Sequence, residues 1–95
     1  MSPQEFFSSD DLTRITDDWT LKAGGLLSLS LHDKGLLPDI GRARMERALD
    51  DVGREMEGYL ERYNAALIQA GEETKNMDRF MAEIMGDRLV VKMAP

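Results

Sequence analysis

His32 is the only histidine of the chain and the first residue to consider for catalysis. Ser28 precedes it by four residues and Asp33 follows it directly, so a nucleophile, a base and an acid lie close together in the sequence. A serine triad also requires a strand-turn-helix elbow and a backbone oxyanion site, whose glycine pattern this sequence lacks. We therefore interpret His32 as a residue at the C-terminal end of a helix, where a charged imidazole is favourable.

Three pairs of adjacent aspartates are the next candidates for chemistry. Their members are Asp10, Asp11, Asp17, Asp18, Asp50 and Asp51. Carboxylates bind hard cations, but these pairs lack the ligand spacing of a calcium loop, and the sequence indicates no pocket that would separate two carboxyl pKa values. We expect these residues to form solvated helix surface. The alternative is an acidic nucleic-acid mimic, an inhibitor from a phage or mobile element that occupies a nucleic-acid-binding protein.

The sequence predicts no cofactor and no metal site, and therefore a protein that is not an enzyme. The chain has no cysteine, which excludes disulfides, thiolate metal sites and a cysteine nucleophile and is typical of a reducing compartment. Gly24, Gly25 and Gly35 are not part of a phosphate-binding loop pattern. We expect a cytoplasmic protein, because the first residues do not resemble a signal peptide and no apolar run reaches the roughly twenty residues of a membrane span.

The net charge lowers the expectation of direct nucleic-acid binding. Eighteen acidic and twelve basic residues give a net charge of −6, which phosphate backbones repel. Arg42, Arg44 and Arg47 form a small basic cluster, but Glu46 and Asp50 interrupt it. We interpret the cluster as solvated helix surface and expect neither a nucleic acid nor a membrane as partner.

The strongest pattern in the sequence is a coiled-coil seam, in which apolar residues alternate in steps of four and three. Its members are Met45, Leu49, Val52, Met56, Tyr59, Tyr63, Ala66 and Ala70. Such a seam is buried by another helix. Leu60 and Leu67 form a second apolar line that widens the stripe beyond what one helix covers. Either the next helix of the chain or a second copy is expected to pack there.

Two long helices are expected to position this seam. Ser8 and Asp11 match a capping box at the start of a helix over residues 9–32, although residues 26–32 also alternate as a strand would. We favour the helix. Gly35 then ends it in a left-handed conformation. A short turn leads into a second helix over residues 39–70, which lies antiparallel to the first as a hairpin.

A shorter third helix is expected over residues 73–85, with Gly86 as its end. After it, residues 87–95 contain the β-branched Val90 and Val91 and no helix signal, and they are expected to be an extended tail. One face of this helix is rich in methionine, which suits either irregular core packing or recognition of a partner. The protein-binding residues that we predict are Leu60, Leu67, Met77, Phe80, Met81, Ile84 and Met85.

Together these patterns predict one all-α domain over residues 1–95. It is an antiparallel helical hairpin with a long second helix and a short third helix, and it dimerises into a four-helix bundle. The function that fits is non-catalytic binding of another protein through helix-helix contacts, as an adaptor, a chaperone-like subunit or an inhibitor.

Overall fold

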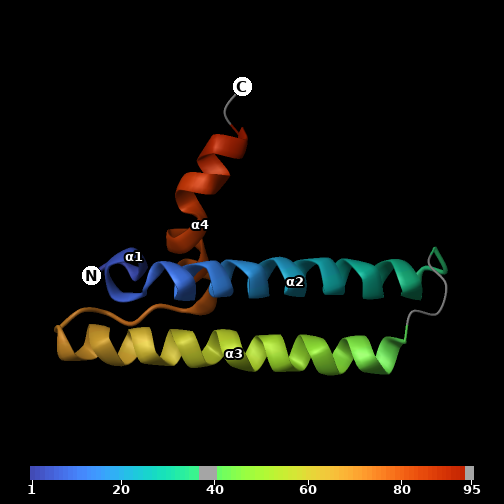
Figure 1. Cartoon of the computed structure of the whole chain (residues 1–95), viewed down its shortest axis with the longest axis horizontal. Coiled ribbons are helices and arrows are strands. Elements are labelled where there is room, and N and C mark those ends of the chain that lie inside the picture. The colour runs from blue at the N-terminus through green and yellow to red at the C-terminus, as the bar shows by residue number, and fades with distance from the viewer. Residues whose placement is uncertain (37–40, 94–95) are drawn as a thin grey trace.

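The computed structural model describes residues 1–36 and 41–93, with the side chains of 87–93 left aside. This part of the chain contains helices and connecting loops and no strand, so the predicted all-α class is confirmed for it. The helices are α1 (Pro3–Phe6), α2 (Ser9–Asp33), α3 (Arg42–Gln69) and α4 (Met77–Met93) (Figure 1). The prediction that the second helix begins at residue 39 falls on residues 37–40, outside the described residues.

Two serines set the beginning of the chain. The Ser2 side chain accepts a hydrogen bond from the Glu5 amide and caps α1, a single turn that the sequence did not predict. Ser8 accepts a hydrogen bond of 3.1 Å from the Asp11 amide and caps α2 at the predicted position. Phe7 connects the two helices and is buried. The first eight residues therefore fold over the end of the hairpin.

The helix α2 continues through its two central glycines to Asp33, so residues 26–32 are helical and not a strand. Gly35 follows with a φ of +72°. This left-handed conformation lets the Leu36 amide donate to the Leu31 carbonyl at 2.9 Å, which satisfies one of the last carbonyls of the helix. The predicted C-terminal role of Gly35 is therefore confirmed.

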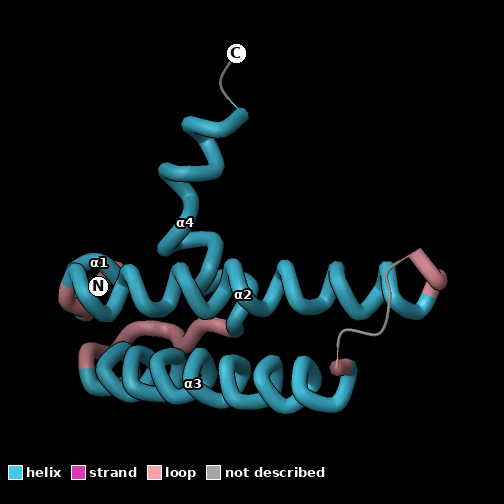
Figure 2. The backbone as a smooth tube through the Cα atoms, turned by 45° about the vertical axis from the view of Figure 1, so that its right-hand side comes forward, coloured by secondary structure: helices cyan, strands magenta, loops and turns pink. Residues whose placement is uncertain are grey.

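The helices α2 and α3 run antiparallel, side by side, along the longest dimension of the molecule (Figures 1 and 2). That dimension is 49 Å. The Leu49 side chain of α3 packs directly on Gly25 of α2: a Cβ atom built on Gly25 would lie 2.5 Å from Leu49 Cδ2. The absence of a side chain at Gly25 leaves room for Leu49 in its observed position.

The helix α4 corrects the predicted end of the chain. It begins at Met77, four residues later than predicted, because the Asn76 side chain accepts a hydrogen bond of 2.9 Å from the Arg79 amide and caps it there. It continues through Gly86 to Met93, so the predicted stop at Gly86 and the predicted extended conformation of 87–93 are wrong. A single glycine costs a helix only about 1 kcal/mol and does not by itself end it. Residues 94–95 are outside the described residues.

The core lies at the end of the hairpin that carries α1 and α4. Its buried apolar residues are Phe7, Ile15, Met56, Tyr59, Tyr63, Leu67, Phe80 and Met81. They come from α2, α3, α4 and the residue that follows α1. Tyr63 is fully buried and donates a hydrogen bond of 2.5 Å from its hydroxyl to the Met1 carbonyl, so the chain start is tied to α3. The ring of Phe80 packs on Tyr63 with ring centres 5.5 Å apart.

Candidate protein-binding site

The hairpin divides into two halves with different surroundings. The inner half comprises residues 9–20 of α2 and 54–69 of α3, and both α1 and α4 lie at this end (Figure 1). The outer half comprises residues 21–33 of α2 and 42–53 of α3. Every residue of the outer half is at least partly exposed, whereas the buried core residues of α2 and α3 all belong to the inner half. Among the described residues, no buried side chain lies in the outer half, so its two helices are covered only by each other.

An apolar groove crosses one face of the outer half, and we call it the glycine groove. Its volume is about 500 Å³. The residues that line it are Leu21, Gly24, Gly25 and Ser28 of α2 and Arg44, Met45, Ala48, Leu49 and Val52 of α3. Eight of these nine residues are uncharged. Small residues form much of its wall, which allows the backbone or side chains of another helix to come close.

The opposite face of the outer half carries a depression of about 570 Å³ with a different character. It is lined by Lys22, Leu26, Leu29, Glu46, Leu49, Asp50, Gly53, Arg54 and Glu57. Five of these nine residues carry a charge. Water solvates such a surface well, so the glycine groove is the drier of the two faces and the better candidate for helix packing.

The helix α2 has leucines on several sides in the outer half. Residues 23–31 contain no charged residue. Leu21, Leu26 and Leu27 are 59%, 53% and 61% exposed. A helix that is apolar over most of its circumference is normally covered on more than one side. Because α3 covers only one side of α2, these leucines indicate a contact surface that the sequence analysis missed. The sequence feature that points to this surface is the run without charges at residues 23–31.

The predicted protein-binding residues lie together, but at the core. Leu67, Phe80 and Met81 are buried within the chain, and Leu60, Met77, Ile84 and Met85 pack against them while partly exposed. The structure thus corresponds to the core alternative for the methionine-rich face of α4. A helix face that packs in the core and a helix face that binds a partner have the same spacing of apolar residues. The sequence therefore did not distinguish between these two roles for α4.

The seam is buried only in its inner part. Met56, Tyr59 and Tyr63 are buried, whereas Met45, Leu49 and Val52 are half-buried. At the C-terminal end of the seam Leu67 is buried in place of Ala66 and Ala70, which are half-buried and exposed. A straight helix drifts by about 20° per heptad relative to a strict seven-residue repeat. The residue that faces the core therefore changes from the seam to the second apolar line, which contains Leu67.

The acidic residues do not act alike. Asp18 is buried, and burial raises the pKa of its carboxyl, with a further contribution from the neighbouring Glu55 carboxylate. Its Oδ2 atom has no hydrogen-bond partner. Asp10, Asp17, Asp50 and Asp51 are exposed and Asp11 is half-exposed. The predicted acidic surface therefore lacks one of its six members.

The candidate triad is not assembled. Asp33 forms an ion pair with Arg42, and this hydrogen bond lowers the pKa of the Asp33 carboxyl. His32 Nδ1 lies 4.0 Å from Asp33 Oδ1, beyond hydrogen-bond distance. Ser28 lines the glycine groove. Asp33 thus connects the end of α2 with the start of α3 and does not orient the imidazole.

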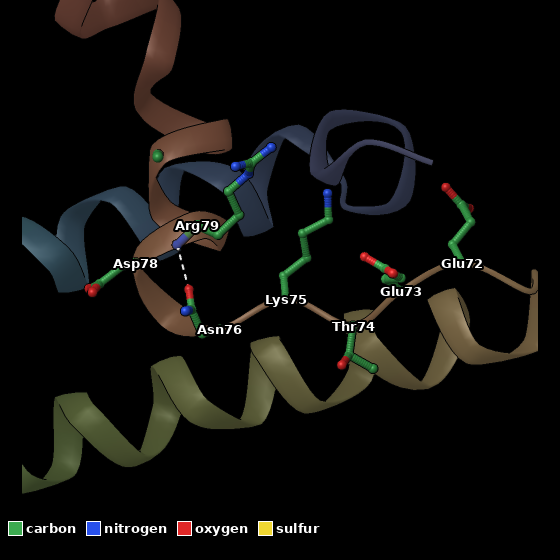
Figure 3. Close-up of a pocket in the computed structure, with 8 residues that line it drawn as sticks. Glu72, Glu73, Thr74, Lys75, Asn76, Asp78 and Arg79 are labelled. Atoms are coloured by element: carbon green, nitrogen blue, oxygen red, sulfur yellow. Dashed lines mark hydrogen bonds between the residues drawn. The ribbon is translucent and has the colours of Figure 1, made fainter.

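The loop between α3 and α4 forms an open polar depression (Figure 3). In Figure 3 the side chains of Lys75 and Arg79 point to the same side of this loop. Lys75 Nζ lies 2.6 Å from Glu83 Oε1, and the backbone of Lys75 is held by two hydrogen bonds to the Asn64 amide side chain. Lys75 is thus held through both its backbone and its ammonium group, so we interpret the loop as a structural connection.

No cluster of three or more histidine, cysteine or acidic side chains suited to a metal ion occurs in the part of the chain that the structure describes. None of the helices in these residues is both long and apolar enough to cross a membrane. Comparisons with protein-family models, with curated proteins and with solved structures gave no match.

Proposed function

We propose that this chain is a non-catalytic protein-binding protein that acts through helix-helix contacts. The contact surface is the outer half of the hairpin. A second copy of the chain binds there and completes an antiparallel four-helix bundle. An adaptor, a chaperone-like subunit or an inhibitor in a reducing compartment such as the cytoplasm would work in this way. The observation that carries the proposal is the apolar glycine groove beside leucines that are more than half exposed.

The exposed leucine of the groove sets the scale of the energy. Full burial of a leucine side chain contributes about 1.5–3 kcal/mol, so covering the exposed part of Leu21, which lines the groove, contributes at most about 2 kcal/mol per copy. Small residues at Gly24, Gly25 and Ala48 let a second pair of helices come close enough to make these contacts. Two-helix units are usually stable only when further helices cover them, which favours four helices over two.

The acidic-mimic hypothesis has less support. Asp18 is buried, so one of the six carboxylates is not available as a phosphate substitute. A mimic would bind through charge, whereas the outer half offers mainly apolar surface. The two hypotheses therefore differ in how salt affects binding.

Sedimentation equilibrium of the full chain over a concentration series tests the proposal. We expect a dimer whose dissociation constant changes little between low and high salt. Ala48→Glu places a charge in the glycine groove and should raise that constant at least about tenfold. Ala65→Glu is the matched control, because Ala65 is an exposed alanine of α3 in the inner half, and it should leave the constant unchanged.

Two results would overturn the proposal. One is a monomer at every concentration. The other is a dimer that Ala48→Glu and Ala65→Glu weaken equally, since the contact would then lie elsewhere. A dimer that dissociates steeply as salt increases would instead favour contacts made by charged groups. Circular dichroism of each variant checks that the helices remain folded.

A further inference from the structure

We propose that the two copies meet through the glycine groove in an isologous, antiparallel arrangement, with Arg44 of each copy facing Asp51 of the other. This inference rests on the proposed function and specifies its partner and its geometry. It follows from two features of the outer half. Its surface contains both a protruding side chain and hollows, and α3 carries a positive charge at Arg44 and a negative charge two turns later at Asp51.

The groove is self-complementary in shape. Gly24, Gly25 and Ala48 provide a wall with little side-chain volume, whereas Leu21 at the same groove is 59% exposed. In an isologous contact the same patch meets itself, so a protruding residue of one copy fits a hollow of the other, and the reverse holds at the symmetric position. One surface can therefore supply both the leucine that inserts and the glycines that receive it.

The charges on α3 select the direction. Arg44 and Asp51 are seven residues apart, which is about two helical turns, so they lie on the same side of α3. Ala48 lies between them along the chain and lines the groove. When two α3 helices cross antiparallel with the symmetry axis close to Ala48, each arginine meets an aspartate. A parallel crossing in the same register would instead bring arginine against arginine and aspartate against aspartate.

Both charged groups are available for this contact. Arg44 is exposed, and it takes part in no ion pair among the described residues. The contact that Asp51 makes with Arg54 is 3.6 Å long, and both side chains are about three-quarters exposed. A surface pair of this kind contributes little to stability, so Asp51 can exchange it for a pair with the second copy.

The opposite face of the outer half is less suitable than the glycine groove for binding a second copy. There, charges of both signs occur along about three turns of α3, at Glu46, Asp50, Arg54 and Glu57. Burying them would require a partner for each, at a desolvation cost that surface ion pairs do not recover. The glycine groove presents a single charge at its end, and the symmetric arrangement supplies the opposite charge for it.

A charge-exchange experiment tests the arrangement. Arg44→Glu and Asp51→Arg are prepared in the full chain, and self-association is measured for each variant and for their equimolar mixture. Each variant alone should dimerise about tenfold more weakly than the unmodified chain, because both symmetric pairs become repulsive. In the mixture, both pairs are again attractive, so a heterodimer of about the original affinity should form. Arg44→Gln and Asp51→Asn, which remove charge without repulsion, should have intermediate effects.

The outcomes separate this inference from the proposed function. A dimer that neither reversed charge weakens overturns the inference and leaves the proposed function in place. A parallel contact brings like residues together in the unmodified chain and in both variants, so it would leave each single variant as strongly associated as the unmodified chain. A mixture that forms no preferred heterodimer also overturns the inference. A chain that is monomeric at all concentrations overturns both.

Discussion

The inner and outer halves of the hairpin are built from the same two helices but differ in what covers them. In the inner half, α1, Phe7 and α4 enclose the seam, and Met56 and Tyr63 are completely buried. In the outer half, the continuation of the same seam at Met45, Leu49 and Val52 is only half-buried. A continuous apolar pattern in the sequence thus has two different uses. One end forms the core of the chain, and the other end forms an exposed surface, which is the contact surface that we propose.

The composition of α2 changes at the boundary between the two halves. The part that precedes residue 21 carries aspartates, threonines and an arginine on its outward side, as a helix with one buried face does. Residues 23–31 carry no charge at all. The outward side of α2 is thus polar in the inner half, whereas in the outer half it exposes uncharged and largely apolar residues.

The largest expected effect is loss of core packing in the inner half. Phe80→Ala removes a fully buried ring that contacts Tyr63 and Phe7, so the free energy of unfolding should fall by about 3–5 kcal/mol. Leu27→Ala changes a residue that is 61% exposed and should lower it by less than about 1 kcal/mol in the monomer. Urea unfolding at low protein concentration measures both. Similar losses for the two variants would contradict the division into a packed and an open half.

A smaller effect is expected from Asp18, a buried carboxylate at the edge of the inner half. Its pKa is raised above the ordinary value of 3.8, chiefly by burial. Between that value and the raised pKa only the unfolded chain is ionised, so the contribution of Asp18 to stability falls as the pH rises through this interval. Asp18→Asn should remove this loss and stabilise the chain at pH 7 by about 1 kcal/mol or less.

Urea unfolding of the Asp18→Asn variant over a pH series checks this expectation. Asp17→Asn is the control, because Asp17 is the exposed neighbour and should leave the pH profile of stability unchanged. An Asp18→Asn variant that is less stable at pH 7 than the unmodified chain would show that the carboxylate is well paired in the folded state, contrary to its unpartnered Oδ2 atom.

The sequence predicted the local features that depend on a few residues. The cap at Ser8, the left-handed end at Gly35 and the helical state of residues 26–32 all follow from nearby hydrogen bonds and spacing. The end of α4 did not follow from such rules. Gly86 was interpreted as a stop, but a glycine ends a helix only where the chain takes a left-handed conformation, and Gly86 is not among the positive-φ glycines of the described residues.

The division of apolar residues between core and surface was not predictable from spacing alone. Phe80 and Met81 were assigned to a recognition surface, yet they are buried because the loop at residues 70–76 returns α4 to the inner half. The direction of that return depends on long-range contacts such as those of Asn64 with Lys75. The single turn α1 was missed for a related reason: four residues carry too little periodicity to be recognised.

Concentration-dependent amide hydrogen exchange of the unmodified chain tests the central claim most directly, because it compares the two halves within one molecule. Residues 24–30 should exchange faster than residues 58–64 in dilute solution. Their exchange should slow by about tenfold or more when the concentration rises from well below to well above the dissociation constant, while the inner half changes less. Exchange of residues 24–30 that is as slow as that of the inner half in dilute solution, or that is independent of concentration, would contradict the account.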